Sequence, residues 1–346
     1  MEQTSAFFVV FLVSTMGIVY NVSCIIMTFV QKMEGIKMDQ TVLVGSTGFV
    51  GGNLKASHTF DAEYHSSDIE RAFERDNDLV VYAGVPSAMF LANQDPQADL
   101  AIMEQARENL RRMKPRRVVL ISTIAVYADS RGKTEADEPD TQQLSAYGAN
   151  RLQLEKWVRE DFPQALIVRL PALYGQGLKK NFLFDLHTVT PALLKPEKYE
   201  QLAAVSELVK KGYSDAGNGF YKLNGQADAH ELRAWFQQND WNALNFTDSR
   251  SVYQFYNLGR LWKDIEAARN AGLHMLNLAT PPVSAAEVHQ AVTGKPFENE
   301  VSAKPFDYDL RTEHAALLGG NNGYLCSREE ELADICNFMK QWEEQA

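Results

Sequence analysis

Short runs of apolar residues alternate with segments of helical periodicity through the first half of this 346-residue chain. The runs at residues 42–44, 78–85 and 117–123 are largely continuous, which is typical of strands buried on both faces of a sheet. Asp95-Pro96 begins a helical segment between the last two runs, with an N-cap residue followed by a first-turn proline. This order predicts an α/β fold with a doubly wound, mostly parallel sheet of the Rossmann type.

The first apolar run ends in three glycines spaced three residues apart. Gly45 can adopt backbone angles that other residues avoid, Gly48 leaves room for a phosphate, and Gly51 lets the next helix lie close to the strand. A pyrophosphate would then meet the unpaired amides and positive dipole end of that helix. An ordinary loop would use small residues too, but the buried strand before this one favours a cofactor site. The predicted contacts are Gly45, Ser46, Thr47, Gly48, Phe49, Val50 and Gly51.

Two further segments bear on the cofactor. A second strand near residues 62–65 is followed by Ser67-Asp68-Ile69-Glu70, which has the form of a helix capping box. The residue at this strand end discriminates the cofactor ribose, and Asp68 is the acidic candidate beside His65 and Ser66, although it could equally serve the helix start. The choice between NAD and NADP therefore stays open. Ala83 and Gly84 end the next strand and are predicted to pass beneath the cofactor, where a simple tight turn would need the same small residues.

Composition narrows the class of function. A formal net charge of -11 argues against a nucleic-acid surface, because phosphate binding relies on clustered Lys and Arg. The three cysteines have neither the number nor the spacing of a disulfide framework or a zinc site. The seven histidines are scattered, and we expect no metal. An acidic cytoplasmic enzyme is the resulting expectation.

Candidate catalytic residues follow the strand at residues 117–123. Thr123 ends that strand, and Tyr147 follows 24 residues later at a predicted helix start. Carbonyl and alcohol chemistry needs such a pair, because the phenol exchanges a proton while the smaller hydroxyl holds the substrate oxygen. Arg151 lies one helical turn after Tyr147 and would favour the phenolate through its positive charge.

These motifs resemble, in this order, the extended short-chain dehydrogenase/reductase superfamily, also called the NAD-dependent epimerase/dehydratase family. They are the glycine turn, Ser122-Thr123-x-x-Val126-Tyr127, Tyr147-x-x-x-Arg151 and Arg169-Leu-Pro-Ala-Leu-Tyr-Gly175. The resemblance covers nearly all of residues 39–340 and implies NAD or NADP, a sugar-like substrate that is usually nucleotide-linked, and cofactor contacts from Tyr147 and Arg151. It also implies a homodimer formed through the helices predicted at residues 95–113 and 146–162. Residues 124 and 125 are not the acidic pair of sugar 4,6-dehydratases, so dehydration is disfavoured.

Arg151 is the main departure, because the family has lysine there. The planar guanidinium of Arg151 keeps the positive charge, but its N–H donors point in different directions from those of a lysine ammonium. We expect catalysis with arginine as the substitute. The alternative is a surface ion pair between Arg151 and Glu155, with Tyr147 merely packed, in a catalytically impaired NAD(P)-binding protein that has a structural or sensing role.

The amino-terminal extension, residues 1–37, differs from the rest of the chain. Residues 6–30 carry no charge and are long enough to span a bilayer, which predicts a possible contact with the inner face of a membrane. Met38 lies three residues before the first strand, where members of the family usually begin. A misplaced start is therefore the alternative that we favour over a true anchor.

Beyond a Rossmann domain at residues 38–178, residues 179–346 are predicted to form a substrate lobe interleaved with the last strands. Asn181 lies in the region that meets substrate in the family, while Phe182 and Phe184 are expected in the core. Residues 214–229 are expected to form an exposed loop. Arg250 could bind a substrate phosphate or carboxylate, or could pair with its neighbour Asp248. A late strand at residues 274–279 and a capped helix from Ser284 complete the pattern.

Overall fold

The computed structural model describes residues 40–73 and 75–345, and the membrane-anchor and misplaced-start hypotheses concern residues outside these ranges. The centre of the fold is a six-stranded sheet in which every pair of neighbours is parallel. The strand order is β12-β5-β4-β3-β1-β2. In chain order these strands are β1 (Thr41–Val44), β2 (Ala62–Tyr64), β3 (Leu79–Tyr82), β4 (Arg117–Thr123), β5 (Leu166–Leu170) and β12 (Met275–Asn277). The Rossmann-like expectation is confirmed.

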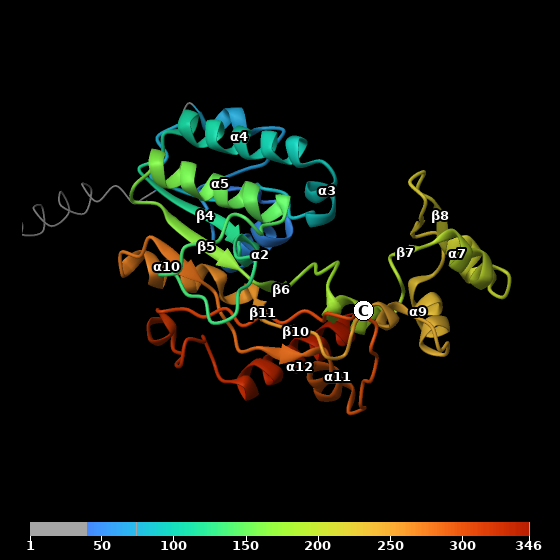
Figure 1. Ribbon diagram of the computed structural model, residues 1–346. Helices are drawn as coiled ribbons and strands as arrows, with labels where there is room; N and C mark the ends of the chain where they lie inside the picture. The colour runs from blue at the N-terminus through green and yellow to red at the C-terminus, as the bar shows by residue number, and fades with distance from the viewer. Residues whose placement is uncertain (1–39, 74, 346) are drawn as a thin grey trace, which may run out of the picture. The chain divides into compact units, whose positions relative to one another are not determined.

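Helices cover both faces of this sheet, as Figure 1 shows. One face packs on α4 (Pro96–Met113) and α5 (Ala146–Asp161), and the other packs on α2 (Phe49–Ser57) and α10 (Leu261–Asn270). Each face of the sheet has its own hydrophobic core, and successive side chains of β1 point to opposite faces. Leu43 packs in the core with α2 and α10, while Val42 and Val44 pack in the core with α4 and α5. Both faces are buried, which explains why the strands are apolar without alternation.

The order of the strands creates a switch point beside β1. The chain leaves β1 toward β2 on one side and then returns to form β3 on the other side of β1. Ligands of open α/β sheets bind in the crevice outside the carboxyl ends of the strands at such a point. The glycine turn lies at this place.

The connection from β2 to β3 differs from the predicted capped helix. A single 3-10 turn, η1 (Ile69–Ala72), replaces it, and no side chain caps this turn within the described chain. The Ser67 hydroxyl instead hydrogen-bonds the ring of His65, and the Asp68 carboxylate accepts from the His65 amide at 2.8 Å. The capping-box prediction is wrong because the side chains of Ser67 and Asp68 bond to His65 instead of to the amides of the next turn.

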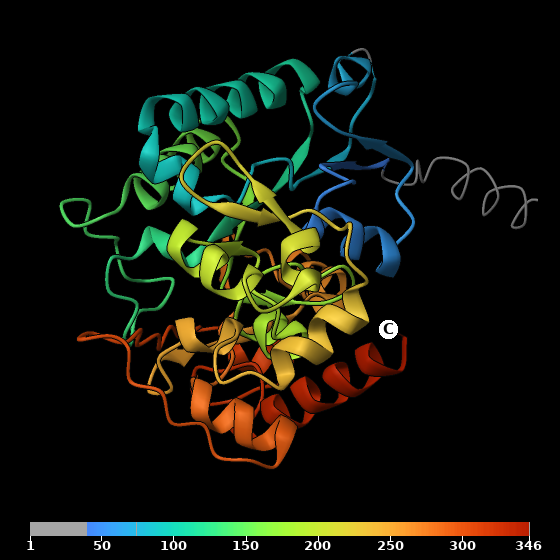
Figure 2. The same cartoon turned by 90° about the vertical axis from the view of Figure 1, so that its right-hand side faces the viewer.

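The second half of the chain adds small sheets around the main one. Strands β6 (Ala172–Tyr174) and β11 (Phe255–Asn257) pair in parallel, and β10 (Val252–Tyr253) pairs with β13 (Val283–Ser284) in antiparallel fashion. Helix α11 (Ala285–Thr293) begins with the capping box of Ser284 and Glu287, as the sequence predicts. Figure 2 shows α11 beside α12 (Arg328–Gln345). None of the helices within the described ranges is long and apolar enough to cross a membrane.

An insertion at residues 193–237 has a core of its own and is coloured yellow-green to yellow in Figure 1. It follows α6 (Phe182–Thr188), whose Phe182 is buried as expected. Its helices are α7 (Pro196–Ala203), α8 (Glu207–Gly212) and α9 (Ala229–Gln237), and its sheet joins β7 (Leu193–Leu194), β9 (Tyr221–Leu223) and β8 (Tyr213–Asp215). The prediction of a plain loop at residues 214–229 is therefore wrong, because most of a hairpin lies there around turn glycines.

Candidate active site

The glycine turn has the backbone geometry that its sequence predicts. Gly45 has a φ of +92°, and a Cβ at this residue would lie 2.5 Å from the carbonyl oxygen of Ala83. A Cβ on Gly51 would lie 2.1 Å from the carbonyl oxygen of Gly45. Both approaches are shorter than any real carbon–oxygen contact, so β1, β3 and α2 can meet here only through glycine.

The amino end of α2 faces the same turn. Gly48 is its N-cap residue, and no side chain in the described ranges caps the helix. The first amides of a helix have no partner inside the helix, and its dipole is positive at this end. The turn therefore offers backbone donors to an anion, which is the arrangement that binds pyrophosphate in nucleotide-binding folds.

A pocket of about 450 Å³ opens beside the turn, at the carboxyl ends of β1, β2 and β3. Its walls combine the glycine turn, the end of β2, the segment that follows β3, and one face of α4. The lining residues are Val44, Gly45, Thr47, Gly48, His65, Ser66, Ile69, Tyr82, Ala83, Gly84, Val85, Pro86, Ala101, Ile102, Gln105, Ala106 and Asn109. The pocket lies at the switch point of the sheet, where a dinucleotide is expected.

Five of the predicted cofactor residues line this pocket, namely Gly45, Thr47, Gly48, Ala83 and Gly84. Ser46, Phe49, Val50, Gly51, Asp68, Tyr147 and Arg151 are not among its lining residues. Gly51 acts through packing rather than through the pocket wall. His65 and Ser66 stand at the position where the ribose is expected, whereas the Asp68 carboxylate is bound to the His65 amide.

The contribution of α4 to the pocket was not anticipated from the sequence. Ile102, Gln105 and Asn109 form part of the wall, and the Asn109 amide donates to the Tyr82 hydroxyl at 3.2 Å. Their spacing of three and four residues is a single helix face, and the polar pair Gln105 and Asn109, four residues apart, could have been recognised within an otherwise apolar stripe.

Tyr147 lies in the first turn of α5 and is held there by backbone contacts. Its amide donates to the side chain of Asn93 at 3.0 Å, from the short helix α3 (Met89–Gln94). A Cβ on Gly148 would lie 2.1 Å from the carbonyl oxygen of Ala125, in the turn η2 (Ile124–Val126). Helix α5 therefore packs directly on the turn that follows β4, which brings Tyr147 toward the end of that strand.

Thr123 ends β4, and its hydroxyl is among the groups that act on the Tyr147 phenol. The Thr123 hydroxyl accepts from the Ala125 amide at 3.1 Å and so fixes the start of the turn. Tyr147 is only 7% exposed. Burial raises the pKa of the Tyr147 phenol, while Arg151 and the Thr123 hydroxyl act in the opposite direction without overcoming it. The phenol is therefore neutral at ordinary pH.

Arg151 is buried against α4 rather than exposed. Its guanidinium donates to the carboxylate of Asp99, and its Nη2 donates to the carbonyl oxygen of Pro86 at 2.7 Å. The same guanidinium lies 3.8 Å from the centre of the Tyr147 ring. The alternative of a surface pair between Arg151 and Glu155 is wrong, because both residues point inward and find different partners.

Glu155 is fully buried and pairs with Arg169 of β5. Arg169 Nη2 donates to Glu155 Oε2 at 2.6 Å, and the Ser122 hydroxyl donates to Glu155 Oε1 at 2.5 Å. Arg169 Nη1 also donates to the Tyr127 hydroxyl at 2.6 Å. This network ties α5 to β4 and β5 directly behind the Thr123 position.

The two predicted substrate residues are occupied by other contacts. The Asn181 side chain caps α6 by accepting from the Leu183 and Phe184 amides, and it donates to the Leu173 carbonyl at 2.8 Å. Arg250 forms a two-bond ion pair with Asp248, at 3.0 and 2.8 Å. Of the two alternatives for Arg250, the structure shows the salt bridge, which leaves no evidence of a substrate contact.

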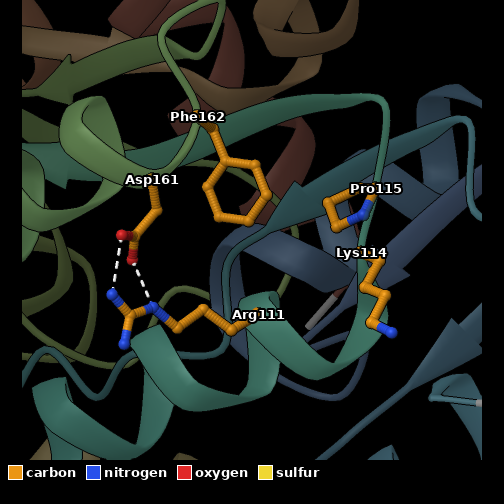
Figure 3. A pocket seen from close by; sticks show the side chains of 5 residues that line it. All are labelled: Arg111, Lys114, Pro115, Asp161 and Phe162. Carbon is orange, nitrogen blue, oxygen red and sulfur yellow. Dashed lines mark hydrogen bonds and ion pairs between the residues drawn. The ribbon is translucent and has the colours of Figure 1, made fainter.

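A second hollow, shown in Figure 3, lies away from this site. It is lined by Arg111, Lys114, Pro115, Asp161 and Phe162. These residues precede β4 and end α5, so the hollow lies at the amino ends of the strands. Asp161 is bound there by the Arg111 guanidinium, which marks a helix-to-helix ion pair rather than a place for a ligand.

Comparison with known proteins agrees with the fold. A family model described as the RmlD substrate binding domain matches residues 40–194. Among solved structures, MoeE5 in complex with UDP-glucose and NAD is 16% identical with a TM-score of 0.56, over 87% of this chain and 99% of that one. A dTDP-4-dehydrorhamnose reductase from Yersinia enterocolitica is 14% identical with a TM-score of 0.58, over 86% and 99%. No curated protein matches.

A third solved structure has the same fold. It is the UDP-glucose 4-epimerase of Thermotoga maritima with UDP-glucose, 12% identical with a TM-score of 0.56, over 87% of this chain and 98% of that one. The parallel sheet and the glycine turn at its switch point define a Rossmann-like protein. The family model covers residues 40–194, and the solved structures share the fold of the chain.

Proposed function

We propose that this protein is an NAD(P)-dependent oxidoreductase or epimerase that acts on a carbonyl or hydroxyl group of a nucleotide-linked sugar. One observation carries the proposal. Pro86 lines the pocket beside the glycine turn, and its carbonyl oxygen accepts a hydrogen bond from Arg151, which lies over the Tyr147 ring. The segment after β3 therefore links the proposed dinucleotide pocket to the proposed acid/base tyrosine, through the contact between Pro86 and Arg151.

The pocket suits a dinucleotide. The α2 amides would meet the pyrophosphate, and His65 and Ser66 would face the adenosine ribose. None of the lining residues, all within the described ranges, is Lys or Arg, which favours NAD over a cofactor with an additional phosphate. Solved structures with this fold contain NAD, among them MoeE5 with UDP-glucuronic acid. When bound, the nicotinamide supplies or accepts the hydride.

The residues of the chain would handle the oxygen and the proton. Thr123 would orient the substrate oxygen from the end of β4, and the Tyr147 phenol would exchange the proton with it. Arg151 would hold the phenol ring and the segment after β3 in position. The nucleotide-linked sugar is proposed from the ligands of the structural neighbours, such as UDP-glucose.

The test is a spectroscopic assay on the purified full-length chain. Nucleotide sugars and their keto forms would be offered with NAD, NADH and the NADP forms, and the absorbance of reduced nicotinamide at about 340 nm would be followed. We expect a change with at least one of them. Tyr147→Phe should lower turnover about 10²- to 10⁴-fold, because the proton donor is lost. Tyr221→Phe, in the insertion, is the matched control and should leave turnover unchanged.

A second candidate is a cofactor-binding protein without turnover. Its support is that Arg151 replaces the family lysine and is held by Asp99. Calorimetric binding of NAD(H) with no change of redox state across the whole substrate panel would favour this candidate. Absence of binding to any nicotinamide dinucleotide would exclude both.

A further inference from the structure

Asp99 is a buried carboxylate that belongs to no motif of the sequence. It lies on α4 and faces the first turn of α5, where its Oδ2 accepts from the Arg151 guanidinium and from Asn150 Nδ2 at 2.9 Å. The side chains of Arg151 and Asp99 are 5% and 7% exposed. A carboxylate is thus in direct contact with the only cation that touches the Tyr147 ring within the described chain.

The charges around Tyr147 decide the form of its phenol. An isolated buried cation beside a phenol would favour the phenolate strongly, because little solvent screens it. Here the Asp99 carboxylate opposes that cation from α4, and α3 and η2 contribute no charged residue. Glu155 on the next turn of α5 is neutralised by Arg169, and Asp95 is bound to the Ala98 amide at the start of α4. The Asp99 carboxylate therefore opposes the effect of Arg151 on the phenol and acts in the same direction as burial, which is the largest cause of the raised pKa of Tyr147.

We propose that Asp99 is a positioning residue that neutralises Arg151, so that Tyr147 serves as a proton donor and the site reduces a carbonyl instead of oxidising an alcohol. The inference rests on the proposed function. In the step it describes, a hydride from the reduced nicotinamide forms the new C–H bond at the carbonyl carbon. The carbonyl oxygen takes the Tyr147 proton, which gives an alcohol, oxidised nicotinamide and a phenolate that solvent then protonates.

This assignment separates the two activities left open above. Epimerisation through an oxidised intermediate begins with removal of a hydroxyl proton, which needs a phenolate. A neutral phenol instead matches a substrate that arrives already as a ketone or aldehyde. The protein would then act after a reaction that generates a carbonyl on the sugar, such as an oxidation or a dehydration carried out by another enzyme.

The first test needs neither cofactor nor substrate. The ultraviolet absorbance of tyrosinate would be titrated with pH in the cofactor-free full-length protein, with Tyr147→Phe subtracted to isolate the one phenol. We expect Asp99→Asn to lower the apparent pKa of Tyr147 by about one to three units, because the Arg151 charge is no longer opposed. Glu108→Gln makes the same charge change on an exposed position of α4 and should leave that pKa unchanged. An unchanged Tyr147 titration in folded Asp99→Asn would overturn the inference.

The double variant Asp99→Asn/Arg151→Met covers the case in which Asp99→Asn alone does not fold. Removal of both charges should leave the Tyr147 titration close to that of the native protein. A large shift in the double variant would contradict the neutralising role of Asp99.

Kinetics separate this inference from the proposed function. In Asp99→Asn the pH profile of reduction should lose its basic limb at lower pH than in the native protein, while the alcohol-oxidising rate at pH 7 should rise relative to the reducing rate. A native protein that oxidises alcohols faster than it reduces carbonyls would refute the inference and leave the proposed function intact. A native protein with no turnover would refute the proposed function, while the cofactor-free titration would still test the electrostatic role of Asp99.

Discussion

Helix α5 carries two buried ion pairs one turn apart, and they differ in how completely each charge is satisfied. Glu155 accepts three bonds from Arg169 and one from Ser122, and both ionic side chains are at most 1% exposed. Arg151 donates to one carboxylate oxygen and two carbonyl oxygens, and it lies over the face of an aromatic ring. The first pair fixes helix to sheet through many bonds, whereas the second leaves its arginine in contact with the Tyr147 ring, the proposed acid/base group.

The different partners of Arg151 and Glu155 show why their spacing along the sequence was a poor guide to the contacts that they make. Arg151 and Glu155 are four apart on a helix, which is the separation of a surface ion pair. Both are instead buried, and a buried charge needs several partners rather than one. Their partners come from α4, β4 and β5, elements that only the tertiary fold brings together.

The fully satisfied pair should give the largest effect on stability. Glu155→Gln leaves the Arg169 charge buried without its partner, and we expect a loss of about 3–5 kcal/mol in the free energy of unfolding. Urea unfolding would measure this loss, provided that the dependence of the unfolding free energy on urea concentration is the same in both proteins. Glu160→Gln, on the exposed face of the same helix, should change stability by less than about 0.5 kcal/mol. A loss for Glu155→Gln as small as that of the control would mean that the Glu155–Arg169 pair contributes little to holding α5.

A smaller loss is expected from the edge of the same network. Tyr127→Phe removes a hydroxyl that accepts from Arg169 and donates to the Thr134 carbonyl at 2.7 Å. Loss of a hydrogen bond to a charged group should cost about 1.5–3 kcal/mol. Tyr308→Phe is the control. Tyr308 packs against the apolar cluster that contains Tyr127, and the structure shows no hydrogen bond of the Tyr308 hydroxyl within the described residues. Equal thermal midpoints for the two variants would show that the Tyr127 hydroxyl does not support the buried pair.

A third pair on α5, at its solvent-facing end, extends the comparison to partial exposure. Asp161 accepts from Arg107 and Arg111 of α4 at 2.7 and 2.8 Å, and these bonds hold the pKa of its carboxyl below the usual range. Asp161→Asn should cost only about 1 kcal/mol at neutral pH, because solvent screens the pair.

The pH dependence of that cost follows from the sign of the pKa shift. A carboxyl with a lowered folded pKa stabilises the fold above its unfolded pKa, at about 4. The difference between the native protein and Asp161→Asn should therefore be constant near neutrality and shrink as pH falls below about 4. Glu104→Gln, exposed on α4, supplies the control. A difference that grows in acid would contradict the ion-pair account.

The sequence predicts the sheet and the glycine turn well because both follow from local patterns. Continuous apolar runs require strands buried on two faces, and Gly45 and Gly51 sit where a Cβ would collide with backbone. The role of Asp99 could not be read in the same way. It depends on the packing of α4 against α5, and a lone aspartate within a helical pattern carries no local signal. The same holds for Arg250, whose sequence neighbour Asp248 fitted either alternative.

The domain boundary at residue 178, the homodimer and the catalytic residue assignments remain predictions. The domain boundary is not a clean division of the fold, because β12, from the second half of the chain, pairs with β5 in the main sheet.

The contact between Gly148 and Ala125 sets how much error the active site can tolerate. Backbone meets backbone there with no side chain between, so a side chain larger than that of glycine at residue 148 would push α5 away from the turn after β4. The distance between the backbone segments that carry Thr123 and Tyr147 is thereby set by main-chain contact. The surrounding side chains can therefore vary while the backbone positions of Thr123 and Tyr147 relative to each other stay the same.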